Sequence, residues 1–187
     1  MRSPYHAGVT SLWEPLRALP PVPVPDRMKA AVLVPLYEDG GHLRVVLTRR
    51  PDHMPTHPGD VVFPGGMVEA GDDGPVDTAI REACEEIGLP RDNVVEVLGG
   101  LQPTHTRSVE MLIVPVVVRI ERPADFTPEP AEVEAIIEPT IGELLPDANW
   151  RTSEWTAGRK MWFYEFPEGV LWGATAFMVR ELLSYFR

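Results

Sequence analysis

Several kinds of residue are scarce in this sequence, and each shortage excludes a class of protein. Its one cysteine, Cys84, cannot form a disulfide within the chain, which fits a reducing, cytoplasmic location. The longest apolar run, Met111 to Val118, is broken by Pro115 and is far shorter than the roughly 20 residues that cross a bilayer. No apolar stretch follows the first six residues, so we expect neither a signal peptide nor a membrane partner.

Positive charge is also scarce. The chain carries 17 Lys and Arg residues against 28 Asp and Glu, which gives a formal net charge of −11 at pH 7. A protein that binds a nucleic-acid backbone needs clustered Lys and Arg, so we expect no nucleic-acid partner. A small anionic substrate remains compatible with this charge, because divalent cations can supply positive charge locally.

Length and composition fit one folded unit with an appended segment. The 187 residues suffice for one ordinary domain, and the hydrophobic content of 44% and charged content of 24% are close to globular averages. Residues 1–27 are rich in proline and are predicted to form an extended arm, while residues 28–187 are predicted to form a single domain. We expect the arm to lie on its own domain; packing across a homodimer partner is the alternative.

The order of the predicted elements indicates an α/β chain of the α+β type. Apolar patterns bounded by turn residues predict strands before and after one central helix, with a second long helix near the end of the chain. This order favours a mixed β-sheet between helices. The predicted strands cover 30–37, 43–48, 61–63, 94–98, 111–120 and 161–166, and the predicted helices cover 75–87, 141–145 and 175–186.

The central helix has clear signals at both ends. Pro75 suits the first helical position, where its missing N–H is no loss, and Asp73 or Gly74 can cap the helix. Gly88 can adopt the left-handed conformation that ends a helix, and Pro90 prevents continuation. The helix should therefore span residues 75–87.

Two faces of this helix differ in chemistry. Glu82, Glu85 and Glu86 follow the i, i+3, i+4 spacing that puts their carboxylates on one face. Three oxygen ligands on a rigid element suit a hard dication, with sites left for water and phosphate oxygens. An acidic helix face alone is more often simply solvated. The other face is an apolar stripe of Ala79, Ile80, Ala83, Cys84 and Ile87.

The preceding loop favours the metal-binding interpretation. A predicted strand leads into Phe63-Pro64-Gly65-Gly66, where two glycines allow close approach of the backbone. Gly66 and the segment Arg81-Glu82-Ala83-Cys84-Glu85-Glu86-Ile87-Gly88-Leu89 resemble the signature of the Nudix hydrolase family. One departure is that Asp72 replaces a Glu, with eight residues rather than seven before Arg81, which leaves the role of Asp72 or its neighbour Asp73 open.

The resemblance implies a fold, a cofactor and a set of site residues. It implies a Nudix-like α/β/α sandwich that hydrolyses a diphosphate linkage. Glu82, Glu85 and Glu86, with Gly66, would form the site for Mg²⁺ or Mn²⁺, and Arg81 would orient the carboxylates. The base that deprotonates the attacking water stays unassigned among the glutamates.

A second stretch resembles the extra motif of the coenzyme A diphosphatases within this family. Thr48, Arg50, Gly59 and the segment 63–66 fall in register with it. It implies a small-molecule, coenzyme A-like nucleotide substrate, cleaved into 3′,5′-ADP and 4′-phosphopantetheine. The substrate-binding candidates are Arg49, Arg50, His57 and Gly65.

Two prolines depart from that motif. Pro51 stands where the pattern has Ser or Ala, and Pro55 stands where it has Arg. Proline offers no donor to a phosphate, whereas the guanidinium group offers a fork of donors. The alternative substrates are therefore ADP-ribose, NADH or a nucleoside triphosphate. A non-catalytic nucleotide-sensing module is a further alternative, although such modules typically lose acidic positions that this chain retains.

Overall fold

The described residues of the computed structural model are 11–105, 112–154 and 160–187, and their strands form two six-stranded sheets. The first sheet has the strand order β2-β1-β8-β6, with β5 paired to β1 and β7 paired to β8. Its central pair, β1 and β8, is parallel, and its other pairs are antiparallel. Its strands are β1 (Met28–Asp39), β2 (His42–Val45), β5 (Gly65–Met67), β6 (Val94–Gly100), β7 (Thr104–His105) and β8 (Leu112–Ile120).

The second sheet has the order β10-β11-β12-β4-β3-β9. The β12–β4 pair is parallel and the rest are antiparallel, so this sheet is mixed as well. Its strands are β3 (Leu47–Arg49), β4 (Asp60–Val62), β9 (Ala135–Ile137), β10 (Trp150–Glu154), β11 (Lys160–Glu165) and β12 (Val170–Trp172).

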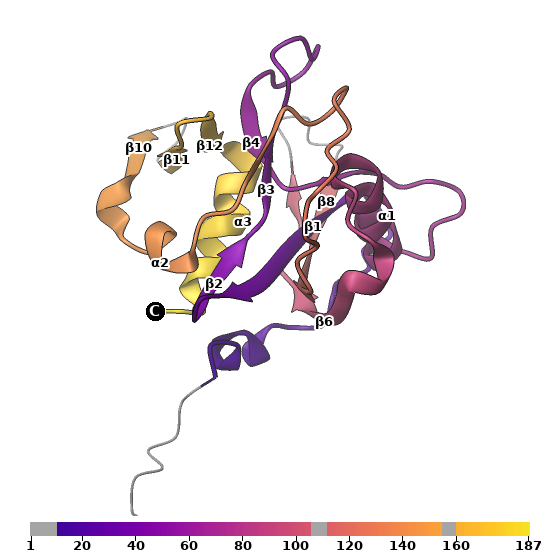
Figure 1. Ribbon diagram of the computed structural model, residues 1–187, viewed down its shortest axis with the longest axis horizontal. Helices are drawn as coiled ribbons and strands as arrows, with labels where there is room; N and C mark the ends of the chain where they lie inside the picture. The colour runs from indigo at the N-terminus through magenta and orange to yellow at the C-terminus, as the bar shows by residue number, and fades with distance from the viewer. Residues whose placement is uncertain (1–10, 106–111, 155–159) are drawn as a thin grey trace, which may run out of the picture.

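Helices cover both faces of the first sheet (Figure 1). The two long helices are α1 (Pro75–Ile87) and α3 (Gly173–Ser184). Alternate residues of β1 face opposite ways: Leu33 packs in one core cluster with α1, and Val34 packs in the other with α3 and the second sheet. The shorter helical segments are η1 (Glu14–Ala18), η2 (Arg91–Asn93), α2 (Ile141–Leu144) and η3 (Asp147–Asn149).

The predicted α+β architecture with a mixed sheet is confirmed, but the strands are divided between two sheets rather than gathered in one. The strand predicted over residues 43–48 is interrupted at Val46, whose N–H bonds to the carbonyl of Pro35 at 3.0 Å. Val45 packs in one core cluster and Val46 in the other, because the chain passes here from the first sheet to the second. Met111, the predicted start of β8, lies outside the described residues.

The described part of the proline-rich arm contacts the first sheet. Leu16 is fully buried and shares a core cluster with Leu36 and Val117. The N–H of Gly100 in β6 donates to the carbonyl of Pro20 at 2.9 Å. Within the described residues, no helix is both long and apolar enough to cross a membrane.

Candidate active site

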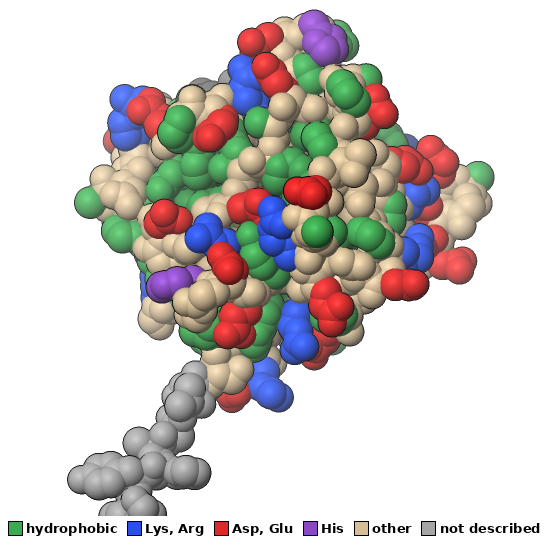
Figure 2. Space-filling view, viewed as in Figure 1, with side chains coloured by type: hydrophobic (Ala, Val, Ile, Leu, Met, Phe, Trp, Pro, Cys, Tyr) green, Lys and Arg blue, Asp and Glu red, His purple; other side chains and the backbone are tan. Residues whose placement is uncertain are grey.

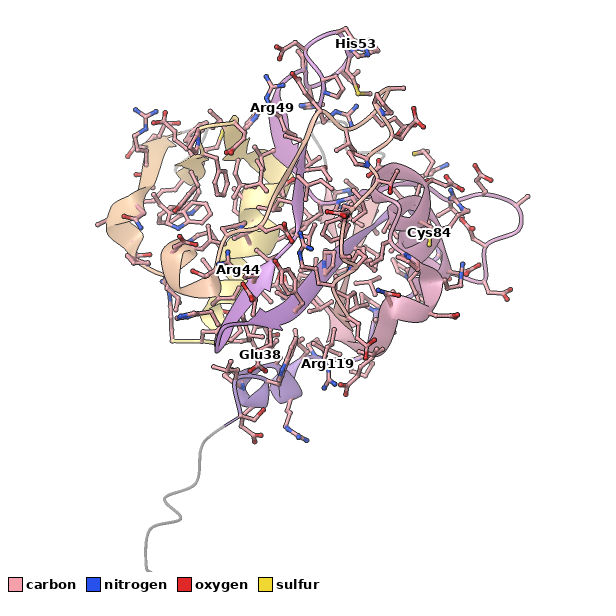
Figure 3. All side chains as sticks on the ribbon, viewed as in Figure 1. Glu38, Arg44, Arg49, His53, Cys84 and Arg119 are labelled. Carbon is pink, nitrogen blue, oxygen red and sulfur yellow. The ribbon has the colours of Figure 1, made fainter. Side chains whose placement is uncertain are left out.

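Helix α1 has the bounds that the sequence predicts. Pro75 is its first residue, and Gly88 ends it in the left-handed conformation with φ of 64°. Gly74 rather than Asp73 occupies the N-cap position, and no side chain caps the helix there. The apolar stripe is buried against the first sheet, except for Cys84, which is partly exposed (Figure 3). This packing fixes the opposite face, which carries the glutamates.

Glu86 is a buried carboxylate. It is 7% exposed, and its Oε2 accepts a hydrogen bond of 3.1 Å from the N–H of Gly65. The pKa of Glu86 is raised to about 8: burial, the largest cause, and the charges of Glu132 and Glu82 raise it, while the Gly65 N–H and the Arg50 charge lower it. A group of this kind gains much from a nearby positive charge.

Glu82 lies against the segment Phe63-Pro64-Gly65-Gly66, which we call the glycine loop. A Cβ atom on Gly66 would stand 2.5 Å from Glu82 Oε1, so any larger residue at position 66 would displace the carboxylate. Burial also raises the pKa of Glu82, with the neighbouring Arg81 acting to lower it. Pairing of Ala31 with Gly66 and of Val32 with Gly65 holds the glycine loop against β1. The register of β5 therefore sets the distance between the loop and both glutamates.

Arg81 is clamped by Asp72, the residue that departs from the family signature. Arg81 Nε donates to Asp72 Oδ1 at 3.0 Å, and its second amino group donates to Oδ2 at 3.1 Å. Asp72 also accepts hydrogen bonds from the N–H of Glu69 and the hydroxyl of Thr78, each at 2.8 Å. The Arg81 hydrogen bonds hold the pKa of the Asp72 carboxyl well below its usual range. Although the loop is one residue longer than in the signature, its acid Asp72 still contacts Arg81.

The remaining donors of Arg81 reach two of the glutamates. One amino group lies 3.0 Å from Glu82 Oε1 and 3.2 Å from Glu85 Oε2, and the other donates to the carbonyl of Met67 at 2.9 Å. Glu85 itself is mostly exposed. Arg81 therefore connects the glycine loop, the acidic loop (residues 68–74) and the glutamate face of α1.

The donor set of this face fits a hard divalent cation. All three candidate ligands are carboxylates, the ligand type that Mg²⁺ and Mn²⁺ prefer. Among the described residues, no three His, Cys, Asp or Glu side chains converge closely enough to form a metal site as they stand. Arg81 holds Glu82 and Glu85 by hydrogen bonds, while Glu86 is held by Gly65. The site thus fits a divalent cation in two respects. Its side chains are oxygen ligands, and a cation would supply the positive charge that would stabilise ionised Glu86.

The two candidate substrate-binding arginines, Arg49 and Arg50, differ in their contacts. Arg49, labelled at the end of β3 in Figure 3, forms ion pairs with Asp52 and Glu134. Arg50 has a buried Nε with no hydrogen-bond partner among the described residues, and its charge lowers the pKa of Glu86. The sequence treats the two as equivalent candidates, but Arg50 is the one that acts on the glutamate site.

His57 and His53 lie on the loop between β3 and β4. His57 has a positive φ of 55°, and its Nδ1 lies 2.9 Å from Asp60 Oδ2. Its ring centroid is 6.0 Å from that of Trp172 in β12, which stacks on Phe163. His53 is exposed at the top of the view in Figure 3. Of the two histidines, His57 is the one joined to an aromatic group.

A segment that the sequence analysis did not single out crosses the end of α1. We call residues 121–138 the strap, and Figure 1 shows it running across the front of the molecule. The N–H of Thr127 donates to the carbonyl of Ile87 at 3.0 Å, and that of Glu129 donates to the carbonyl of Glu86 at 2.8 Å. Glu132 of the strap raises the pKa of both Glu82 and Glu86. No periodic pattern marks this acidic residue, so its place could not be read from the sequence.

Two cavities lie away from these carboxylates. One of about 350 Å³ is lined by residues that include Arg44, Glu138 and Tyr164. Another of about 540 Å³ is lined by residues that include Trp13 and Arg119. Neither includes a residue of α1 or of the glycine loop, so neither belongs to the site described above. On the face shown in Figure 2, Lys and Arg side chains are interspersed with Asp and Glu.

The fold is similar to that of several solved structures, two of which are described here. A Caenorhabditis elegans Ap4A hydrolase in a binary complex has a TM-score of 0.51 and 19% sequence identity, covering 63% of this chain and 83% of that chain. A MutT/nudix family protein from Enterococcus faecalis also has a TM-score of 0.51, at 17% identity, covering 88% of this chain and 63% of that chain. At these identities the likeness concerns the fold alone.

Sequence comparison adds closer relatives. Nudix hydrolase 22, chloroplastic, of Arabidopsis thaliana is 38% identical over 180 residues, which cover 91% of this chain but only 57% of that relative's length. An uncharacterized Nudix hydrolase NudL of Enterobacter sp. (strain 638) is 34% identical, covering 84% of this chain and 82% of its own. The peroxisomal coenzyme A diphosphatase ndx-8 of Caenorhabditis elegans is 37% identical, and the match covers 80% of this chain and 64% of that relative's length.

The chain also matches the model of a whole family. Residues 27–158 match the NUDIX domain, and this range includes the glycine loop, all of α1 and the strap. The chain belongs to the Nudix family.

Proposed function

We propose that this protein hydrolyses the diphosphate linkage of a nucleoside diphosphate derivative with the help of Mg²⁺ or Mn²⁺. The observation that carries the proposal is Glu86, a buried carboxylate whose Oε2 lies 3.1 Å from the N–H of Gly65. Burying a carboxylate among other acids is costly unless a cation joins it. Members of the Nudix family generally need divalent cations of this kind.

Glu82, Glu85 and Glu86 would hold the cation. Bound there, it would neutralise the charge of the diphosphate and make a bound water acidic enough to act as the nucleophile. Arg81 orients Glu82 and Glu85 through its hydrogen bonds, and Asp72 fixes Arg81 from behind. The glycine loop presents the Gly65 N–H to Glu86, which keeps that carboxylate in one position. These contacts limit the positions that the acids can adopt before the substrate arrives.

Within this reaction class, coenzyme A and its derivatives are the proposed substrates. The chain matches the coenzyme A diphosphatase motif at Thr48, Arg50 and Gly59, and a relative with 37% identity is named as a coenzyme A diphosphatase. Arg50 supports this choice because its buried Nε has no hydrogen-bond partner among the described residues. A phosphate oxygen is a suitable acceptor for an unpaired guanidinium donor.

The two motif departures set the alternative. Pro55 is exposed on the loop between β3 and β4, at a position where the motif has an arginine. One cation fewer weakens discrimination for the 3′-phosphate of coenzyme A, so ADP-ribose, NADH or a nucleoside triphosphate is the second candidate. His57 and its neighbour Trp172 offer rings that could contact a base in either case.

A substrate panel separates these candidates. Purified protein is assayed with coenzyme A, ADP-ribose, NADH and ATP, each with Mg²⁺ and with Mn²⁺, and the products are identified by mass. We expect coenzyme A to give 3′,5′-ADP and 4′-phosphopantetheine with the highest kcat/KM of the panel. ADP-ribose cleaved far faster than coenzyme A would overturn the substrate choice. Tight nucleotide binding without any hydrolysis would favour a sensing module instead.

A further inference from the structure

We propose that Arg49 is a positioning residue that joins the substrate loop to the strap and does not bind the substrate. The substrate loop is defined here as residues 50–59. This inference rests on the proposed diphosphate hydrolysis. It assigns different roles to two adjacent arginines that the sequence leaves equivalent.

The contacts of Arg49 lie on two segments far apart in the sequence. Its side chain is 16% exposed, with one amino group paired with Glu134 of the strap and the other 2.7 Å from Asp52 Oδ1 of the substrate loop. The backbone repeats the connection, because the N–H of Glu134 donates to the carbonyl of Arg49 at 2.9 Å. Arg49 therefore holds the strap with both its main chain and its side chain.

A third segment closes around the same guanidinium group. A Cβ atom on Gly59 would stand 3.4 Å from an Arg49 amino group, and one on Gly169, in the β11–β12 turn, would stand 3.6 Å from Arg49 Nε. Both glycines thus lie close to the guanidinium group. Three loops meet at this one side chain.

The charges around Arg49 argue against a phosphate contact. Two carboxylates already surround one positive charge, so an incoming phosphate would meet a site with excess negative charge. It would also have to displace two charge-assisted hydrogen bonds. Arg50, by contrast, has a buried Nε without a hydrogen-bond partner among the described residues and lowers the pKa of Glu86.

The contacts of Arg49 with Asp52 and Glu134, which we call the clamp, act on the site through Arg50 and the strap. On one side, Arg49 precedes Arg50, whose main chain bonds to Asp60 at 3.0 Å and to Gly59 at 3.1 Å. On the other side, the strap bonds to the last turn of α1, where the N–H of Glu129 donates to the carbonyl of Glu86. Breaking the contacts of Arg49 would therefore loosen both the Arg50 guanidinium group and the buried Glu86 carboxylate.

The test compares three variants, Arg49→Gln, Glu134→Gln and the double variant, on the diphosphate that the wild type hydrolyses fastest. We expect each single variant to lower kcat/KM about tenfold, and the double variant to be no worse than either, because all three break one clamp. Glu134 is half exposed, so a glutamine at this position keeps its contact with water and the variant should fold. The matched control is Glu165→Gln, a similarly exposed glutamate that pairs with Arg151, and this variant should leave kcat/KM unchanged.

Two results would contradict the proposal. If Glu134 merely competes with the substrate for Arg49, Glu134→Gln will lower KM instead of reducing kcat/KM. If Arg49 binds the 3′-phosphate, Arg49→Gln will lose much more activity on coenzyme A than on dephospho-coenzyme A, whereas a clamp affects both equally.

Hydrogen exchange supplies a readout that does not depend on activity. We expect Glu134→Gln to speed amide exchange in both the substrate loop and the strap, and Glu165→Gln to change neither. Faster exchange in the strap alone would show that Arg49 does not couple the two segments. If the wild type hydrolyses no diphosphate in the panel, the proposed function fails, and the exchange result still decides whether the clamp exists.

Discussion

Glu86 is the buried carboxyl group of the candidate site. The residue is buried on α1, next to Glu82 and Glu132, and accepts a hydrogen bond from the Gly65 N–H. Burial raises its pKa to about 8 from an ordinary value of 4.5. Between these two values the folded protein retains a proton that the unfolded chain releases, so stability falls as the pH rises through this window.

Replacing Glu86 with glutamine removes this pH-dependent loss. In EDTA, we expect Glu86→Gln and wild type to differ in Tm by the same amount below about pH 4.5, and the variant to gain several degrees on the wild type by pH 8. Adding Mg²⁺ should narrow that gain, because the cation stabilises the ionised wild type. The measurement is a set of thermal melts across pH. A gap that stays constant from pH 4 to pH 9 would show that Glu86 does not titrate in this range.

Gly66 leaves room for the Glu82 carboxylate. A Cβ atom there would stand 2.5 Å from Glu82 Oε1, so we expect Gly66→Ala to displace Glu82 and to weaken Mg²⁺ activation about tenfold. The measurement is a titration of turnover with Mg²⁺. Gly71→Ala is the matched control, since nothing lies within 4 Å of a Cβ atom at that position. Equal metal dependence in the two variants would mean that the glycine loop does not position Glu82.

At the scale of elements, the acidic loop before α1 supplies an acidic partner for Arg81, although its spacing differs from that of the family signature. Asp72 accepts hydrogen bonds from Arg81, Thr78 and Glu69, and its side chain is only 4% exposed. The loop therefore joins the start of the helix to the middle of its glutamate face. The extra residue lengthens the loop without breaking the contact to Arg81.

Replacing Asp72 with asparagine should weaken this junction. We expect Asp72→Asn to lower the free energy of unfolding by about 2 kcal/mol, the order of a lost hydrogen bond to a charged group, and to reduce turnover as well. Chemical denaturation at pH 7 measures the first effect. Asp77→Asn, which loses a more exposed ion pair with Arg91, is the control and should cost less. An equal cost for both variants would show that the Arg81 clamp adds nothing.

The elements differ in how far the sequence determines them. The bounds of α1 follow from Pro75 and Gly88, because those residues start and stop a helix by local geometry. The break at Val46 could not be predicted, since the apolar pattern runs through it and only the packing of two sheets turns the chain there. The Arg49 contact to Glu134 joins residues 85 positions apart, and no local pattern reports such a pair.

At the scale of the whole molecule, the proline-rich arm contributes to the core of the first sheet. Leu16 is fully buried among residues of β1, β8 and α3. The prolines explain why residues 11–27, the described part of the arm, form no strand ladder, but they do not reveal where its leucines pack. The described residues of the arm contact their own chain. The division into an arm of residues 1–27 and a single domain of residues 28–187 stays a prediction.

Truncating Leu16 should therefore destabilise the whole fold. We expect Leu16→Ala to lower the free energy of unfolding by about 3 kcal/mol, as for other fully buried leucines. Leu12→Ala, at a position that is 37% exposed, is the control and should cost far less. Urea denaturation of both variants measures the difference. Equal, small losses would indicate that the arm only rests on the surface.

The central claim is that the glutamate face of α1 carries out metal-dependent diphosphate hydrolysis. The most direct measurement is the turnover of coenzyme A by wild type and by Glu86→Gln at saturating Mg²⁺, with folding checked by circular dichroism. The predicted result is a loss of about a hundredfold or more in the variant, with formation of 3′,5′-ADP and 4′-phosphopantetheine by the wild type alone at comparable times. Unchanged turnover in a folded Glu86→Gln variant would contradict the account.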